Sequence, residues 1–466
     1  MPRRLPVLLV TALVASVTSG VAAAAPPVPD SALLPAGGTA APPDATELRV
    51  RCAQLPEALD GPQIPRAQQI LDFASVWPMT RGAGQVVAVI DTGVHPHPRL
   101  PPPIPGGDYV STGDGTEDCD AHGTLVAGLI AARPVAGSGF AGGAPDVEVI
   151  AIRQSSAHFA DRSRSHDEAA RNASGYGDVR TLAAAVRRAV DLGATVVNIS
   201  EVACRSVSEG LADGPLGAAV QYATEVHDAV VVAAAGNTDS CREGNPPAVD
   251  PVDPHADPWD SVVTLASPAW YDEYVLTVGA VEDDGTPAGY SLPGPWVDVA
   301  APGSALVSLN PGTDGLADLV PGPQGGRPLS GTSFAAPLVT ATVALVRSRH
   351  PHLSAREVAA RIERTAHSPA EGWNPLVGHG VIDPLAAVTA PLTAERGAPV
   401  PVPVDEPTPL PAPDHRPRNI ALLAATAVGV ATVLALVLTA PVRRTARPHS
   451  RAVSYLRSPQ PRPEQG

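Results

Sequence analysis

The sequence predicts an α/β protein built on a mostly parallel sheet with helices on both faces. Between about residues 80 and 389, short apolar runs with little polar alternation recur, as in strands buried on both faces of a parallel sheet. Segments with helical spacing of apolar residues lie between these runs, which gives a repeated βαβ pattern. Right-handed crossovers of such units place helices on both faces of the sheet. A hydrophobic content of 44% is sufficient for a large core.

The expected elements alternate along the chain. Strands are expected at residues 86–90, 147–151, 195–199 and 230–234, and helices at residues 123–132, 178–192 and 216–227. A longer apolar helix is expected from Ser333 to about His350. The segment lengths agree with buried strands of about four to eight residues and helices of about ten or more.

Residues 1–25 have the pattern of a secretory signal peptide. Met1 to Arg4 carry two Arg, a mostly apolar and uncharged run follows from Leu5 to Val17, and Ala22 to Ala25 are small residues suited to cleavage. The alternative is a buried or amphipathic helix that is not cleaved. The signal pattern predicts an exported protein.

An uncharged apolar run near the other end, Ile420 to Ala440, is about long enough to cross a bilayer as a helix. Pro-rich segments flank the run on both sides, which argues against the alternative of a buried core helix. Arg443, Arg444, Arg447 and Arg451 follow it, and the positive-inside rule then places the tail in the cytoplasm and the preceding chain outside. We therefore expect a single-pass protein of the cell membrane whose main domain is extracytoplasmic.

These features divide the chain into six segments. They are a signal peptide at 1–25, an N-terminal extension at 26–79, a globular domain at 80–390, a Pro-rich linker at 391–419, a transmembrane helix at 420–440 and a cytoplasmic tail at 441–466. Pro26 to Pro43 is rich in Pro and Ala without periodicity and should be extended or poorly ordered. Pro391 to Pro417 should form a semi-rigid spacer.

Charge and cysteine content exclude several classes of function. The formal net charge of −15 argues against a nucleic-acid partner, because phosphate binding is driven by clustered cations. In an exported chain an even number of cysteines suggests disulfides, here with three possible pairings. The four are Cys52, Cys119, Cys204 and Cys241. Their spacing is not that of a zinc site, and no metal or other cofactor is expected. The acidic pair Glu117-Asp118 is expected to be solvated surface rather than a calcium site.

Three motifs contain candidate catalytic residues. Asp91 lies in Val-Ile-Asp-Thr-Gly, where a buried strand ends in a Gly turn, and catalytic groups of open α/β sheets gather at such strand ends. His122 begins a helix with the sequence His-Gly-Thr-Leu-Val-Ala-Gly, and Ser333 lies in Gly-Thr-Ser-Phe-Ala-Ala-Pro at the start of the long helix. Each motif alone has a structural alternative: an ordinary turn for Asp91, a capping or surface position for His122 and a helix N-cap for Ser333.

Asn237 adds a fourth motif, Ala-Ala-Gly-Asn, in which a buried strand ends on Gly-Asn. Alone, this motif is also an ordinary strand-ending turn. The four motifs together, in the order Asp, His, Asn, Ser, favour one catalytic site over four coincidences.

With these motifs the sequence resembles the subtilisin-like serine proteases from about Gly82 to Ala387. Further matching stretches are Gly142 to Pro145, Val278 to Val281 and Val297 to Gly303. The resemblance implies a subtilisin-like fold. It also implies Ser333 as nucleophile, His122 as general base and then acid, Asp91 as the group that orients the imidazolium, and Asn237 as an oxyanion-hole amide.

The resemblance also implies where a peptide substrate binds. The strand that ends near Ser200 resembles one wall of the cleft and the stretch from Ala234 to Gly236 the other, so an extended peptide would add as a strand between them. Val202 replaces a Gly found in many relatives, and the fit near the specificity pocket is therefore expected to differ.

Within that family the chain is similar to the mycosins, membrane-anchored proteases of type VII secretion systems. The similarity rests on the four Cys, the Pro-rich stalk with an apolar C-terminal helix, and a long polar segment from Ser155 to Gly177 that should be flexible. It implies the pairings Cys52 with Cys119 and Cys204 with Cys241. It also implies partners among the secretion-system membrane components and limited processing of secreted protein substrates. Two alternatives remain open: a mainly structural role in the secretion complex, and general degradation at the cell surface.

Overall fold

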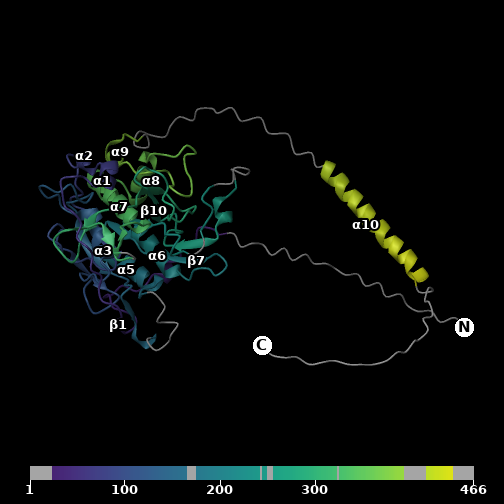
Figure 1. The fold of residues 1–466 in the computed structure, drawn as a ribbon, viewed down its shortest axis with the longest axis horizontal. Coiled ribbons are helices and arrows are strands. Elements are labelled where there is room, and N and C mark those ends of the chain that lie inside the picture. The colour runs from purple at the N-terminus through teal and green to yellow at the C-terminus, as the bar shows by residue number, and fades with distance from the viewer. Residues whose placement is uncertain are drawn as a thin grey trace, which may run out of the picture. The chain divides into compact units, whose positions relative to one another are not determined.

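A computed structural model describes residues 24–164, 175–241, 244–248, 256–322, 325–392 and 416–443 (Figure 1). The chain forms two compact units, Met1–Arg396 and Gly397–Gly466. Most of the expected signal peptide, linker and cytoplasmic tail lies outside the described residues, at 1–23, 393–415 and 444–466.

A seven-stranded sheet forms the centre of the first unit, and every neighbouring pair of its strands is parallel. The strand order is β11-β10-β8-β6-β2-β4-β3. The strands are β2 (Val86–Asp91), β3 (Ile104–Asp108), β4 (Glu148–Arg153), β6 (Val196–Ile199), β8 (Val230–Ala234), β10 (Val275–Val281) and β11 (Val299–Pro302). The parallel sheet predicted from the apolar runs is confirmed, and the four expected strands correspond to β2, β4, β6 and β8.

Successive side chains of β2 point to opposite faces of the sheet and enter two different cores. Val87 and Val89 pack in the same core as the buried residues of α3 (His122–Ala131) and α7 (Thr332–Arg349). Ala88 and Ile90 pack with α5 (Val179–Asp191) and α6 (Gly214–Gln221) on the other face. The expected helices on both faces are therefore present (Figure 1).

Some of the helices begin where the sequence provides a side-chain cap. Asp178 caps α5 and Ser354 caps α8, each in a reciprocal arrangement with the side chain of the third helical residue. The helix expected to reach His227 ends as α6 at Gln221 and continues as a π-turn over Tyr222–Val226. Among the described residues, the remaining helices of this unit are α1 (Arg66–Leu71), α2 (Phe73–Val76), α8 (Ala355–Thr365), α9 (Pro384–Thr389) and the short turns η1 (Ser31–Leu33), η2 (Arg162–Arg164) and η4 (Pro258–Ser261).

The N-terminal extension lies on the surface of the same unit. Its strand β1 (Thr46–Leu48) pairs antiparallel with β5 (Phe159–Asp161). Before β1, the carbonyl of Pro35 accepts a hydrogen bond from Arg187, and that of Gly38 accepts one from Arg188 at 3.0 Å. The segment from Pro26 to Pro43 has no regular element apart from η1, and these two contacts connect it to α5.

The structure corrects the expectation of a flexible segment from Ser155 to Gly177 at residues 159–164. Residues 165–174 lie outside the described part of the chain, but β5 and η2 are regular elements within the segment. The reason is that β5 gains a partner, β1, that lies far away in the sequence. Three small antiparallel pairs complete the unit: β7 (Ala203–Ser206) with β9 (Thr264–Ser267), β12 (Ser308–Leu309) with β13 (Leu316–Ala317), and β14 (Leu319–Val320) with β15 (Arg327–Pro328).

The second unit contains α10 (Arg416–Arg443). Among the described residues, the structure has no helix that is both long enough and apolar enough to cross a membrane. The span expected at Ile420 to Ala440 falls within α10, whose side chains are described only for residues 421–436.

Candidate active site

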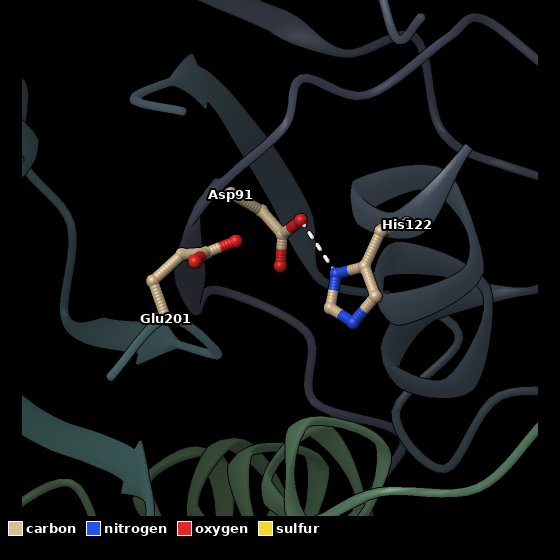
Figure 2. A group of neighbouring side chains, drawn as sticks. All are labelled: Asp91, His122 and Glu201. Atoms are coloured by element: carbon tan, nitrogen blue, oxygen red, sulfur yellow. Dashed lines mark hydrogen bonds and ion pairs between the residues drawn. The ribbon is translucent and has the colours of Figure 1, made fainter. Parts of the chain in front are cut away.

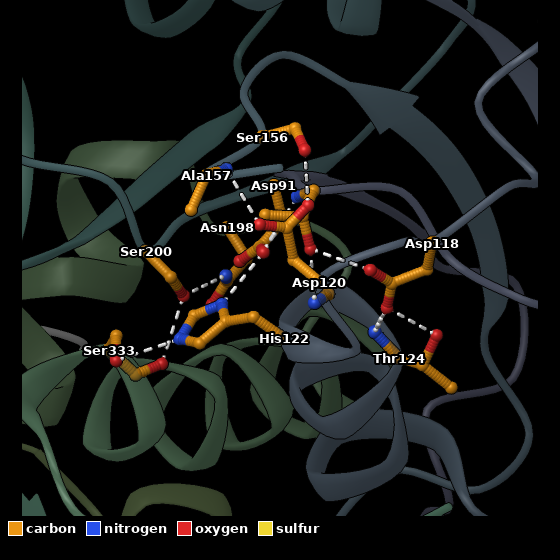
Figure 3. Close-up of polar contacts among 12 residues, drawn as sticks. Asp91, Asp118, Asp120, His122, Thr124, Ser156, Ala157, Asn198, Ser200 and Ser333 are labelled. Carbon is orange, nitrogen blue, oxygen red and sulfur yellow. Dashed lines mark hydrogen bonds and ion pairs between the residues drawn. The ribbon is translucent and has the colours of Figure 1, made fainter. Parts of the chain in front are cut away.

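Asp91, His122 and Ser333 form one continuous hydrogen-bonded series (Figure 3). Nδ1 of His122 lies 2.7 Å from Oδ1 of Asp91, and Nε2 lies 3.0 Å from Oγ of Ser333. Asp91 is the last residue of β2, His122 the first of α3, and Ser333 lies in the first turn of α7. The structure therefore brings together three side chains that the sequence separates widely.

Glycines allow the elements that carry these side chains to approach. A Cβ at Gly123 would lie 2.0 Å from the carbonyl oxygen of Gly93, and a Cβ at Gly93, where φ is +106°, would lie 2.0 Å from that of Glu117. No side chain fits at either position. The Gly residues next to Asp91 and His122 in the motifs thus permit the contact between β2 and α3.

The turn before α3 is held by Asp118. Its carboxylate accepts hydrogen bonds from Oγ1 of Thr92 at 2.8 Å and from both N and Oγ1 of Thr124, at 2.8 and 2.6 Å. Burial outweighs these bonds and raises the pKa of Asp118 to about 6. Asp118 is thus a structural acceptor between the Asp91 and His122 segments rather than a solvated residue, which corrects the expectation for Asp118, whereas Glu117 is exposed as expected.

His122 is surrounded by negative charge. Burial of the ring disfavours its charged form, but the charge and hydrogen bond of Asp91, together with the charges of Glu201 and Asp118, outweigh burial and raise the pKa of His122 to about 9. The ring also lies 4.8 Å from that of Phe334, centroid to centroid. The site therefore stabilises an imidazolium, the species that forms when a histidine takes the proton of a serine nucleophile.

Pro337 explains how the backbone of Ser333 is held. Proline has no N–H, so in α7 it cannot donate to the carbonyl four residues earlier, which is that of Ser333. Oγ of Ser200 donates to this carbonyl instead, at 2.9 Å, and itself accepts from Nδ2 of Asn198 at 3.0 Å. Ser200, expected to bind substrate, thus supports the backbone of the nucleophile.

Asn237 lies beside Ser333 with its amide fixed in one orientation. Its Oδ1 accepts hydrogen bonds from N and Oγ1 of Thr332, at 3.0 and 3.1 Å. A Cβ built at Gly331 would lie 3.1 Å from Oγ of Ser333 and 3.5 Å from Nδ2 of Asn237, so both atoms border the same space. Because Oδ1 is engaged by Thr332, the N–H groups of the Asn237 amide are directed toward that space.

The other two expected substrate-binding residues are less accessible. Ala234 is 1% exposed within β8, and the carbonyl of Gly236 accepts a hydrogen bond from N of Leu292 at 2.9 Å. A cleft of about 770 Å³ passes the catalytic residues. Its lining includes His122, Ser333 and Asn237, and the loop residues Ser155 to His158 and Gly175 to Gly177. A substrate contact of Ser200, Ala234 or Gly236 stays a prediction.

Glu201 is a site residue that the sequence motifs did not reveal. It lines the cleft, and its carboxyl points toward that of Asp91 (Figure 2). Its signal in the sequence is its position just after β6, because β6 neighbours β2 with Ile199 opposite Ile90. Carboxyl ends of neighbouring parallel strands meet at one edge of the sheet, so Glu201 arrives beside Asp91. Asp91, His122 and Glu201 do not form an open metal site, because both ring nitrogens of His122 are already hydrogen-bonded.

Two disulfides connect the four cysteines, Cys52 with Cys119 and Cys204 with Cys241. These are the pairings that the resemblance implied. The first joins the N-terminal extension to the segment just before His122, and N of Ala53 also donates to the carbonyl of Cys119 at 2.8 Å. The extension is thus fixed next to the site.

Known proteins agree with this geometry. The family model described as the subtilase family matches residues 82–380. Mycosin-4 of Mycobacterium tuberculosis is 47% identical over 90% of this chain and 91% of its own length, and mycosin-3 of the same organism is 41% identical over 91% and 94%. Subtilisin DY of Bacillus licheniformis is 30% identical over 66% of this chain and 92% of its own.

Solved structures show the same similarity. The MycP3 protease from the type VII (ESX-3) secretion system has a TM-score of 0.72 and 44% identity, covering 79% of this chain and all of that one. A chain of the periplasmic assembly from the ESX-5 inner membrane complex has a TM-score of 0.75 and 40% identity, covering 84% of this chain and 99% of that one.

Proposed function

The chain belongs to the subtilase family and, within it, to the mycosins, and it is a subtilisin-like serine peptidase. We propose that it cleaves peptide bonds with Ser333, His122 and Asp91. The observation that carries this proposal is the uninterrupted series of hydrogen bonds from Asp91 through His122 to Ser333, at 2.7 and 3.0 Å.

Each member of the series has one role in acyl transfer. Oγ of Ser333 attacks the substrate carbonyl carbon while Nε2 of His122 takes the hydroxyl proton. His122 then gives this proton to the leaving amine, which breaks the peptide bond and leaves an acyl group on Ser333. A water molecule, deprotonated by His122, then attacks the acyl carbon; its bond to Oγ of Ser333 breaks, Oγ takes the proton back from His122, and the acid product leaves. Asp91 holds Nδ1–H of His122 and stabilises its positive charge throughout.

Asn237 and the helix start supply the oxyanion hole. Nδ2 of Asn237 and the backbone N–H of Ser333, which lies in the first turn of α7 without an intrahelical acceptor, are the donors for the negative oxygen. The space beside Gly331, bordered by Oγ of Ser333 and Nδ2 of Asn237, supports this role.

The substrates that we propose are secreted proteins cleaved at few positions. The cleft is bordered by two loops and by the disulfide-tethered extension, which favours an extended segment over a folded protein surface. With a signal peptide at 1–25 and an anchor at Ile420 to Ala440, the peptidase domain meets such proteins after export. Truncation before Ile420 tests the anchor: it should release an active, soluble domain from the membrane fraction.

Support of a type VII secretion complex is a second function, favoured by one observation. A similar chain was solved within the periplasmic assembly of an ESX-5 inner membrane complex. The two functions separate in a comparison of a gene deletion with a Ser333→Ala strain. If secretion fails only in the deletion, the protein acts there as a structural component; if both strains fail, cleavage itself is required.

A further inference from the structure

A second carboxyl group faces the catalytic pair from the neighbouring strand. Glu201 follows β6, and Figure 2 shows its side chain reaching back toward Asp91 at the end of β2. Ligand atoms of Asp91, His122 and Glu201 all lie within 4.8 Å of one another. Two acidic groups and one basic group thus share a small volume beside the cleft.

One oxygen of the Asp91 carboxylate has no hydrogen-bond partner in the described part of the chain. Oδ1 of Asp91 accepts from Nδ1 of His122 and from N of Thr92, both at 2.7 Å. Oδ2 is buried and has no hydrogen-bond partner among the described residues. The Asp91 side chain is wholly buried, so water does not compensate its charge. A nearby ionisable carboxyl therefore interacts strongly with this pair.

The charged groups around Glu201 come from several elements. Asp91 belongs to β2, His122 to α3, and Asp120 to the turn before α3, where it accepts from Oγ of Ser156 at 2.5 Å and from N of Ala157 at 2.6 Å. His158 lies 3.9 Å from Asp120, the charge of Asp118 acts on His122, and α7 contributes the uncharged Ser333 and Phe334. Among these groups, His122 is the cation closest to Glu201.

We propose that Glu201 is a positioning residue of the peptidase, a second carboxylate that acts through His122 by stabilising its protonated form. This inference rests on the proposed function of His122 as general base. Glu201 makes His122 a stronger base, and as a consequence the enzyme acquires its free imidazole only at higher pH.

The direction of the ionisations supports this assignment. The Glu201 charge is among the causes that hold the pKa of His122 at about 9. Burial and the Asp91 charge raise the pKa of Glu201, whereas His122 and the hydroxyl of Ser155 lower it. The ionised form of Glu201 and the protonated form of His122 thus each favour the charged state of the other.

Glu201→Gln removes the charge with little change of shape. Opposite unit charges about 5 Å apart interact appreciably at an effective dielectric constant of about 20, so the acidic limb of kcat/KM should move down by at least about one pH unit. The constant value of kcat/KM at pH above that limb should fall several-fold, because a weaker base accepts the serine proton less readily. A purely structural residue would lower this constant value without moving the limb.

A titration of His122 by NMR in the Ser333→Ala protein tests the inference without turnover. With chelator present, the His122 pKa should be at least about one unit lower in the Ser333→Ala/Glu201→Gln protein. Glu209→Gln is the control, because Glu209 is an exposed carboxylate paired with Arg205 at 3.6 Å, and it should leave the titration unchanged. Glu201→Asp, which keeps the charge, should lower the His122 pKa less than Glu201→Gln does. If the Glu201→Gln protein does not fold, the Glu201→Asp protein is titrated in its place.

The outcomes separate the inference from the proposed function. An unchanged His122 pKa in Glu201→Gln overturns the inference, whatever the activity. A lowered pKa in a protein that cleaves no peptide supports it and refutes the peptidase function instead. Inhibition by Zn²⁺ that Glu201→Gln relieves, without any change in the titration, would identify a metal site and also overturn it.

Discussion

Oγ of Ser200 donates a hydrogen bond to the backbone carbonyl of Ser333, at 2.9 Å, where Pro337 leaves that carbonyl without an intrahelical donor. Ser200→Ala should therefore destabilise the protein by about 1–2 kcal/mol and lower kcat, because a buried acceptor at the nucleophile loses its partner. Thermal unfolding and kcat measure the two effects.

A double-mutant cycle with Pro337→Ala makes this prediction specific. The Pro337→Ala substitution would restore the N–H that α7 lacks, so the Ser333 carbonyl would have a donor within the helix. Ser200→Ala should then cost less in the Pro337→Ala background than in the native protein. Equal costs in both backgrounds would show that Ser200 acts in some other way.

Ser333→Ala should abolish peptidase activity without unfolding the protein, because it removes one oxygen atom and little packing. His122→Ala should be nearly as inactive, since residues that act as one unit do not contribute additively. Turnover of a peptide substrate and thermal unfolding of each purified variant are the measurements. Substantial turnover by Ser333→Ala would refute the mechanism.

Asn237→Ala should lower kcat by about 10²–10³-fold with little change in KM, because the amide acts on charge that develops in the transition state. Thr332→Val removes the hydroxyl that donates to Oδ1 of Asn237 at 3.1 Å and accepts from N of Gly236 at 3.2 Å, and it keeps the backbone donor to Oδ1 at 3.0 Å. Its loss of kcat should be smaller. A change confined to KM in Asn237→Ala would assign the residue to substrate binding.

The catalytic residues were predictable because each is marked by its own neighbours. Asp91, His122 and Ser333 lie next to Gly or other small residues that close contact requires. Glu201 has no such local mark, and its place depends on the register of β6 against β2. The pairing of β1 with β5 was missed for the same reason, since these strands lie more than a hundred residues apart.

Other parts of the fold could not be predicted from the composition of their own segments. Strand β3 has the sequence Ile-Pro-Gly-Gly-Asp, which reads as a turn, and it forms a strand only because it lies at the edge of the sheet beside β4. The cysteine pairing came from the resemblance to the mycosins, because spacing alone left three possibilities. The sequence thus revealed elements with local signals and missed those fixed by distant partners.

Asp272→Asn should stabilise the protein at pH 7–8 and have little effect near pH 4. Burial, with the charges of Glu363 and Glu273, raises the pKa of Asp272 to about 6. A carboxyl whose folded pKa lies above its unfolded value of about 3.8 opposes folding once it is ionised, and this penalty disappears as the pH falls from about 6 to about 4.

Thermal unfolding as a function of pH measures this effect. A gain of about 1 kcal/mol at neutral pH is expected, reduced by partial exposure. Asp318→Asn is the control, since Asp318 is exposed, and it should leave the pH dependence unchanged. Equal stabilisation by Asp272→Asn at pH 4 and pH 8 would contradict the assignment.

The Cys52–Cys119 disulfide should persist in the mature protein and keep the N-terminal extension on the peptidase domain. The bond closes 67 residues of chain, and the loss of unfolded-state entropy corresponds to about 4 kcal/mol. Replacing both cysteines by Ser should lower Tm and raise hydrogen exchange in β1 and β5, because the extension then depends on that strand pair and on its contacts with Arg187 and Arg188.

Removal of the Cys204–Cys241 bond is the matched control. That bond spans 37 residues and joins β7 to the segment after β8, so its loss should also lower Tm but leave exchange in β1 unchanged. Non-reducing peptide mapping of the mature protein provides the direct check. If Cys52 were absent from the mature chain, the extension would be a discarded segment, and the contacts of Ala53 with Cys119 and of β1 with β5 would belong only to the precursor.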